Sequence, residues 1–130
     1  MKQEALLAVN DLHVQFAVRA AGSRPWHKAA ALKAVNGVSF TLQAGETLGI
    51  VGESGCGKST LARQLTLIEA PSEGELFINQ AATAKLGKRA LKHLRSEIQM
   101  VFQNPYGSLN PRQTIAYQLT EPLTIHTRLT

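Results

Sequence analysis

The sequence predicts an α/β fold with a mixed sheet whose N-terminal part is antiparallel. Two stretches with alternating or β-rich patterns come first, Leu6–Phe16 and Leu32–Leu42, and the polar, proline-containing stretch Arg19–Ala30 separates them. They are typical of two strands joined by a long loop. The short apolar run Thr47–Val51 is bounded by glycine and is typical of a strand buried on both faces. Helix formers fill Ser59–Ile68, so a buried strand leads through a loop into a helix, as α/β folds require.

The remaining elements are shorter and alternate between the two types. Leu61, Leu65 and Ile68 recur at spacings of four and three, which predicts an amphipathic helix that Pro71 ends. After it we expect, in chain order, a strand at Glu75–Ile78, a turn at Asn79–Gln80, a basic amphipathic helix at Lys85–Arg95, a strand at Ile98–Phe102, a loop around Pro105 and Pro111, and a helix beginning at Thr114–Leu119 that Pro122 interrupts.

Length and composition limit the class of protein. A chain of 130 residues with 44% hydrophobic content suits one globular domain. The net charge of +5 is compatible with nucleic acid, a membrane surface or a phosphorylated ligand, but no nucleic-acid recognition motif accompanies it. We interpret the basic helix as a solvated face, with anionic lipid or nucleic acid as the alternative. The single cysteine excludes an internal disulfide, and the N-terminus resembles neither a signal peptide nor a spanning helix, so we expect a cytosolic chain.

The stretch Gly52–Thr60 carries the clearest chemical signal. Residues 52–59 satisfy the pattern G-x-x-x-x-G-K-[ST] of a loop that wraps the phosphates of a nucleotide. Its glycines permit positive φ and a close approach of backbone N–H groups, and the following helix N-terminus adds partial positive charge. The whole stretch is therefore the candidate nucleotide site, namely Gly52, Glu53, Ser54, Gly55, Cys56, Gly57, Lys58, Ser59 and Thr60.

Three of these side chains have specific expected roles. Lys58 can reach the β- and γ-phosphates, the Ser59 hydroxyl can coordinate Mg²⁺, and Thr60 can bond the α-phosphate. The fold is accordingly a P-loop NTPase core with ATP and Mg²⁺ as expected ligands. Cys56 lies near the helix N-terminus, where thiol pKa values tend to fall, so a redox role stands beside the simpler interpretation that it contributes only its backbone N–H.

The phosphate loop alone is shared by kinases, GTPases, helicases and transporter ATPases, so other segments must discriminate. The full stretch Gly52–Thr60, the strand and turn at Val35–Thr47, and Met100–Pro105 together resemble the ATP-binding cassette ATPases. Within that family, Val101–Arg112 is similar to the ATPase subunits of bacterial dipeptide and oligopeptide importers. A kinase of small metabolites does not require a glutamine in the context Phe102–Pro105.

The resemblance implies two further site residues. Gln103 matches the family's Q-loop glutamine, which would contact Mg²⁺ or the attacking water and join Lys58 in catalysis; a neutral amide can accept from water and donate to phosphate. Phe16 stands where family members stack adenine on an aromatic ring, with Trp26 as its rival.

The resemblance also implies what the chain lacks. The family's Walker B aspartate-glutamate pair, its signature motif and its switch histidine have no counterpart, and His13, His27, His93 and His126 are interpreted as ordinary surface or loop residues. Residues 1–130 are therefore expected to be the N-terminal part of one ATP-binding domain, truncated before its helical subdomain is complete. Such a part would bind ATP without hydrolysing it alone. The alternatives are an inactive nucleotide-binding remnant and the ATPase of a related nickel importer.

The family relationship finally implies partners and a location. These are transmembrane permease subunits, a second ATPase subunit and, indirectly, a periplasmic binding protein, with no nucleic acid. The protein would lie peripherally at the cytoplasmic face of the inner membrane.

Overall fold

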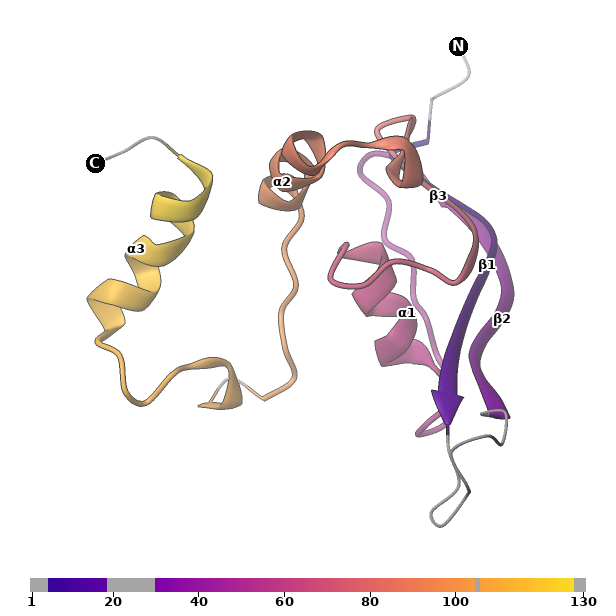
Figure 1. Cartoon of the computed structure of the whole chain (residues 1–130), viewed down its shortest axis with the longest axis horizontal. Helices are drawn as coiled ribbons and strands as arrows, with labels where there is room; N and C mark the ends of the chain where they lie inside the picture. Colours follow the sequence, from indigo (N-terminus) through magenta and orange to yellow (C-terminus); the bar gives the residue numbers. More distant parts are fainter. Residues whose placement is uncertain (1–4, 19–29, 105, 128–130) are drawn as a thin grey trace, which may run out of the picture. The chain divides into compact units, whose positions relative to one another are not determined.

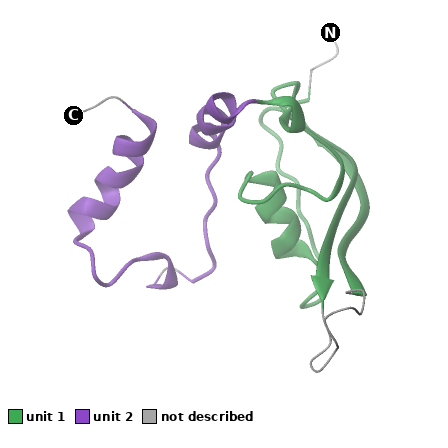
Figure 2. Cartoon of the chain, in the orientation of Figure 1, with its two compact units in different colours: residues 1–86 green, residues 87–130 purple. Residues whose placement is uncertain are grey.

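The computed structural model describes residues 5–18, 30–104 and 106–127, and it divides the chain into two compact units. The first unit is Met1–Leu86 and the second is Gly87–Thr130 (Figure 2). Within the described ranges, no helix is both long enough and apolar enough to cross a membrane.

The first unit is built on a four-stranded antiparallel sheet (Figure 1). Its strands are β1 (Leu7–Val18), β2 (Ala30–Leu42), β3 (Glu73–Ile78) and β4 (Ala81–Ala82), in the spatial order β2-β1-β3-β4. The two long strands confirm the N-terminal antiparallel prediction, each extending about two residues beyond the predicted bound at the loop between them. β3 begins two residues before the predicted Glu75, and the turn at residues 79–80 has positive φ at both positions.

A bulge in β1 decides which side chains reach the core. The pairing with β2 shifts register between Val9 and Leu12, and Asp11 between them has φ 46°. An extra residue in a strand changes which face the following side chains point to, so Val9, Leu12 and Val14 are all buried. The alternation in the sequence alone could not show this shift.

The helix α1 (Lys58–Leu65) follows the phosphate loop and lies beside the sheet (Figure 1). It begins one residue before the predicted Ser59 and ends three residues before the predicted Ile68. Leu67 has φ 59°, a left-handed conformation that cannot continue a right-handed helix. Leu67 itself is buried, so its apolar character contributes to the core from outside the helix.

Two predicted strands are absent from the described residues. Neither Thr47–Val51 nor Ile98–Phe102 has strand hydrogen bonding, and the side chains of Val51 and Val101 are 92% and 95% exposed. The reason is physical: a strand is stabilised by hydrogen bonds to a neighbouring strand, and no described segment pairs with either run. The described sheet is therefore antiparallel throughout.

The second unit contains α2 (Lys88–Glu97), the short 3₁₀ turn η2 (Tyr106–Ser108) and α3 (Ile115–His126). The basic helix starts three residues later than predicted, because Lys85 belongs to a separate 3₁₀ turn, η1 (Thr83–Lys85), and Gly87 is extended.

The prediction that Pro122 interrupts the last helix was wrong. α3 runs through Pro122 to His126. A proline removes one backbone hydrogen bond, but α3 has no buried residue, so the carbonyl group that loses its partner can bond water instead.

Candidate functional site

The phosphate loop leads into the first turn of α1, as the sequence predicts, although the segment before the loop is not the predicted strand. Gly55 and Gly57 have φ values of 82° and 99°, in the left-handed region that favours glycine. Gly57 is the N-cap of α1, and the first helical hydrogen bond runs from the Leu61 N–H to the Gly57 carbonyl at 2.8 Å. The backbone therefore bends sharply at the point where the helix begins.

Gly57 also fixes the loop against the sheet. A Cβ atom at this position would overlap the backbone carbonyl oxygen of Ala34 in β2. At Gly52 an added Cβ would stand 2.6 Å from Sγ of Cys56, which is the end of a side chain and can move. The contact with Ala34 involves backbone only, so Gly57 is the glycine that the loop's position requires.

The first turn of α1 presents backbone donors that no side chain of the helix satisfies. The N-cap is a glycine and makes no side-chain capping bond, and the first turn contains no acidic residue. Helix geometry leaves the N–H groups of Lys58, Ser59 and Thr60 without partners inside the helix. Together with the positive end of the helix dipole, these donors form an environment that favours an anion.

The ammonium group of Lys58 lies over the loop that precedes it. Nζ donates to the carbonyl oxygens of Gly52 at 2.7 Å and Glu53 at 2.6 Å, and it lies 3.5 Å from Sγ of Cys56. These contacts hold a cation beside the first-turn amides. The loop thus combines one fixed positive charge with several backbone donors, as phosphate recognition needs.

A cavity of about 410 Å³ adjoins the loop within the first unit. The loop contributes Cys56, Gly57 and Lys58 to its wall, and β2 contributes residues between Lys33 and Val38. Its volume falls in the range of small-molecule sites. Cys56 is exposed at this wall, so its thiol is accessible whatever its role.

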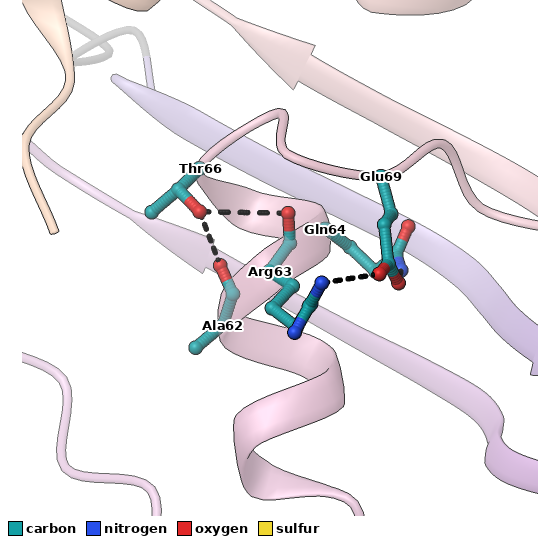
Figure 3. A network of polar contacts seen from close by, with 5 residues as sticks. All are labelled: Ala62, Arg63, Gln64, Thr66 and Glu69. Carbon is teal, nitrogen blue, oxygen red and sulfur yellow. Dashed lines mark hydrogen bonds and ion pairs between the residues drawn. The ribbon is translucent and has the colours of Figure 1, made fainter. Parts of the chain in front are cut away.

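The far end of α1 is anchored by a polar cluster that the sequence did not reveal (Figure 3). Gln64 is fully buried, and its Nε2 donates to Oε2 of Glu69 at 3.4 Å, while Arg63 forms a 2.7 Å ion pair with Oε1 of the same carboxylate. Thr66 donates its hydroxyl to the carbonyl oxygen of Ala62 at 2.8 Å. The helical spacing puts Gln64 on the same face as Leu61 and Leu65, which is a signal for burial. A single glutamine on that face does not by itself indicate a polar cluster.

The other predicted site residues are divided between the two units, with Phe16 in the unit that holds the loop and Gln103 in the second unit. Phe16 lies near the end of β1, is 42% exposed and pairs with Leu32. Gln103 is exposed in the second unit, where it lines a cavity of about 300 Å³ with Phe102, Asn104, Gly107 and Ser108. Its place relative to the loop stays a prediction. Trp26 lies outside the described residues.

The remaining candidates for metal or acid-base chemistry have simpler environments. In the described ranges, no cluster of three or more His, Cys, Asp or Glu residues could hold a metal ion. Nε2 of His13 lies 3.1 Å from Oδ1 of Asp11, and Nδ1 of His93 lies 3.2 Å from Oε1 of Glu97, while His126 is exposed at the end of α3. His27 lies outside the described residues.

Comparison with known proteins agrees with this geometry. The family model described as "ABC transporter" matches residues 35–128. The chain is 54% identical over 127 residues to the di/tripeptide transport ATP-binding protein DppF of Pseudomonas aeruginosa, covering 97% of the chain and 38% of that protein. It is 49% identical over 127 residues to the dipeptide transport ATP-binding protein DppF of Escherichia coli, covering 98% of the chain and 37% of that protein.

Among solved structures, the chain is similar to the dimeric structure of MJ0796, described as a bacterial ABC transporter cassette. The TM-score is 0.72 at 22% identity, over 95% of this chain and 49% of that one. This likeness confirms the predicted fold class. The chain spans well under half the length of the two curated relatives, at 38% and 37%.

Proposed function

Since the chain belongs to the ABC transporter family, we propose that it is the ATP-binding part of a bacterial importer for dipeptides or oligopeptides. The observation that carries this proposal is the phosphate loop, in which the Lys58 ammonium lies 2.7 Å from the Gly52 carbonyl oxygen and 2.6 Å from that of Glu53, beside the uncapped first turn of α1. A triphosphate matches that arrangement in charge and in its need for several donors.

Different residues of the loop bind different parts of the nucleotide. Lys58 neutralises charge on the β- and γ-phosphates, and backbone N–H groups of residues 52–60 surround the chain of phosphates. Ser59 is an exposed residue of the first turn, where its hydroxyl can bind Mg²⁺, and Thr60 contacts the α-phosphate. The ion supplies charge neutralisation on the phosphates when bound.

Two residues outside the loop complete the proposed site. Gln103 contributes an amide that bonds Mg²⁺ or a water molecule near the γ-phosphate, and Phe16 contributes a ring for adenine. The exposure of both side chains supports these roles, because a contact with ligand requires an accessible group.

The substrate and partners follow from the relatives. Proteins named for dipeptide, di/tripeptide and oligopeptide transport match almost the whole chain, which favours a peptide importer over one for nickel. We propose that the protein works with transmembrane permease subunits and a second ATPase subunit, and indirectly with a periplasmic binding protein. We propose a peripheral location at the cytoplasmic face of the inner membrane.

The domain proposal is that residues 1–130 form the N-terminal part of one ATP-binding domain. Phosphoryl transfer also needs an acidic Mg²⁺ ligand, and the family's Walker B pair, signature motif and switch histidine have no counterpart in these residues. We therefore propose that the chain binds ATP but does not hydrolyse it alone. Sustained Mg²⁺-dependent phosphate release from the purified chain would refute this.

Titration with a fluorescent ATP analogue tests the binding function. Lys58→Ala should abolish measurable binding, because the triphosphate loses its fixed cation. Lys85→Ala is the matched control, since Lys85 is an exposed lysine of the same unit outside the loop. Undiminished affinity in Lys58→Ala, or an equal loss in the control, would overturn the assignment of the loop.

A further inference from the structure

The side chain of Gln118 in α3 pairs with the backbone of the loop that precedes the helix. Its Oε1 accepts from the Asn110 N–H at 3.0 Å, and its Nε2 donates to the Asn110 carbonyl at 3.1 Å. The same Nε2 donates to the Gln113 carbonyl at 3.2 Å. One amide side chain thus engages both backbone polar groups of Asn110, as a neighbouring strand would.

We call the contacts of Gln118 with Asn110 and Gln113 the clamp, and further hydrogen bonds lie within the loop on either side of Asn110. Oδ1 of Asn110 accepts from the Arg112 N–H at 3.0 Å. At the other end of the loop, Oδ1 of Asn104 accepts from the Gly107 N–H at 3.2 Å, and the Asn104 carbonyl accepts from the Ser108 hydroxyl at 2.9 Å. Asn104, which accepts the last two of these bonds, is the immediate neighbour of Gln103 in the chain.

Apolar burial does not hold this segment. α3 contains no buried residue, and the described residues from 101 to 112 are all exposed. Gln113 and Gln118 are the half-buried residues of the junction. Since packing contributes little, the conformation of the loop depends on its polar contacts, and Gln118 supplies three of them.

We propose that Gln118 is a positioning residue for Gln103: it fixes the loop at residues 106–113 to α3 and so restricts the positions that the Gln103 amide can take. This rests on the proposed function, because Gln103 has a role only if the chain binds Mg²⁺–ATP. Gln118 itself touches no ligand; it acts through the loop.

Hydrogen exchange of the full 130-residue chain tests the clamp directly. In Gln118→Ala the Asn110 amide should exchange about tenfold faster, because it loses its acceptor. Gln118→Glu keeps an oxygen that can accept from the Asn110 N–H, but it replaces the Nε2 donor of the Asn110 and Gln113 carbonyls with a second oxygen. The exchange of the Asn110 amide should therefore accelerate less than in Gln118→Ala. Glu121→Ala is the matched control, an exposed polar residue one turn further along α3. Unchanged exchange at Asn110 in Gln118→Ala would overturn the proposal.

The Mg²⁺ dependence of ATP binding tests the positioning role. Gln103→Ala should lower the gain in ATP affinity that Mg²⁺ provides, and Gln118→Ala should lower the same gain by about threefold to tenfold, leaving Mg²⁺-free affinity unchanged. The double variant should lose no more than Gln103→Ala alone, since both changes act through one group.

Three results would count against the role. The first is that Mg²⁺ still raises ATP affinity fully in Gln118→Ala but not in Gln103→Ala, which would show that Gln118 does not position Gln103. The second is that the double variant loses more of this gain than Gln103→Ala alone, which would show that the two residues act separately. The third is that Mg²⁺ still raises ATP affinity fully in Gln103→Ala, which would contradict both the role of Gln103 and the positioning role of Gln118. In that last case, loss of binding in Lys58→Ala would still support ATP binding by the loop, so failure of this inference is distinguishable from failure of the proposed function.

Discussion

Gly57 of the phosphate loop faces β2 so closely that a Cβ atom added to it would overlap the backbone carbonyl oxygen of Ala34. The φ of Gly57 is also 99°, outside the range that side-chain-bearing residues readily adopt. The replacement Gly57→Ala therefore combines backbone strain with a backbone clash. The strain alone costs about 1–3 kcal/mol, so we expect a larger loss in the free energy of unfolding, measured with urea, and a displaced loop that binds ATP weakly.

Gly55→Ala separates the two causes. Gly55 has φ 82°, yet no atom lies within 4 Å of an added Cβ. This variant should show the strain without the clash and be the less destabilised of the two. Equal losses in the two variants would mean that the approach to Ala34 contributes nothing.

Gly74 in β3 stands in a similar relationship to Asp11 in the bulge of β1. Its φ is 90°, and an added Cβ would overlap the Asp11 carbonyl. Gly74→Ala should disturb the pairing of β1 with β3 and lower the free energy of unfolding by more than about 1 kcal/mol. Gly87 has φ −71° and open space around it, so Gly87→Ala involves neither left-handed strain nor a clash and should be the less destabilised of the two variants. Urea denaturation of both variants checks this, and a neutral Gly74→Ala would contradict it.

The sequence predicts the elements that are determined locally. The structure confirms the strands β1 and β2 and the helix α1, although Ile68 of the predicted apolar spacing lies outside the helix and is exposed. The phosphate loop follows from its glycines and Lys58 in the same way. The runs Thr47–Val51 and Ile98–Phe102 differ, because an apolar run becomes a strand only beside a partner, and the described residues offer none.

Other features depend on contacts that no local pattern encodes. Periodicity puts Gln64 on the same face of α1 as Leu61, but it does not show that this glutamine is fully buried. The clamp that Gln118 forms on Asn110 requires the loop to return to the helix, and the bulge at Asp11 requires knowledge of the register with β2. These are relationships between segments, so they appear only in the folded chain.

The polar cluster at the end of α1 allows the contribution of a buried side chain to stability to be compared with that of a partly exposed ion pair. Gln64 is fully buried, and Gln64→Ala should lower the free energy of unfolding by about 2–4 kcal/mol, through the cavity it leaves and the hydrogen bonds it loses. Arg63 is half-exposed in its ion pair with Glu69, so Arg63→Ala should cost less than about 1 kcal/mol, and less still at high salt. Thermal or urea denaturation of both variants provides the comparison, and a larger effect from Arg63 would reverse the interpretation.

Phe16 offers the sharpest test of nucleotide identity, because its ring would meet the base and not the phosphates. A stacked base contributes about 1–3 kcal/mol by comparison with alanine, so Phe16→Ala should weaken ATP binding by roughly fivefold to a hundredfold. Affinity for inorganic triphosphate should stay unchanged, since that ligand has no adenine. Phe16 is 42% exposed, so the variant should remain folded.

Trp26→Ala is the rival variant in the same titration. A loss confined to Trp26→Ala would transfer the adenine contact to that residue, and the exposed ring of Phe16 would then be a feature of the β1–β2 surface beside Leu32. A loss of triphosphate affinity in Phe16→Ala would contradict adenine stacking, because it would show that the substitution disturbs the phosphate loop itself. The ratio of the two affinities therefore reports on the base alone.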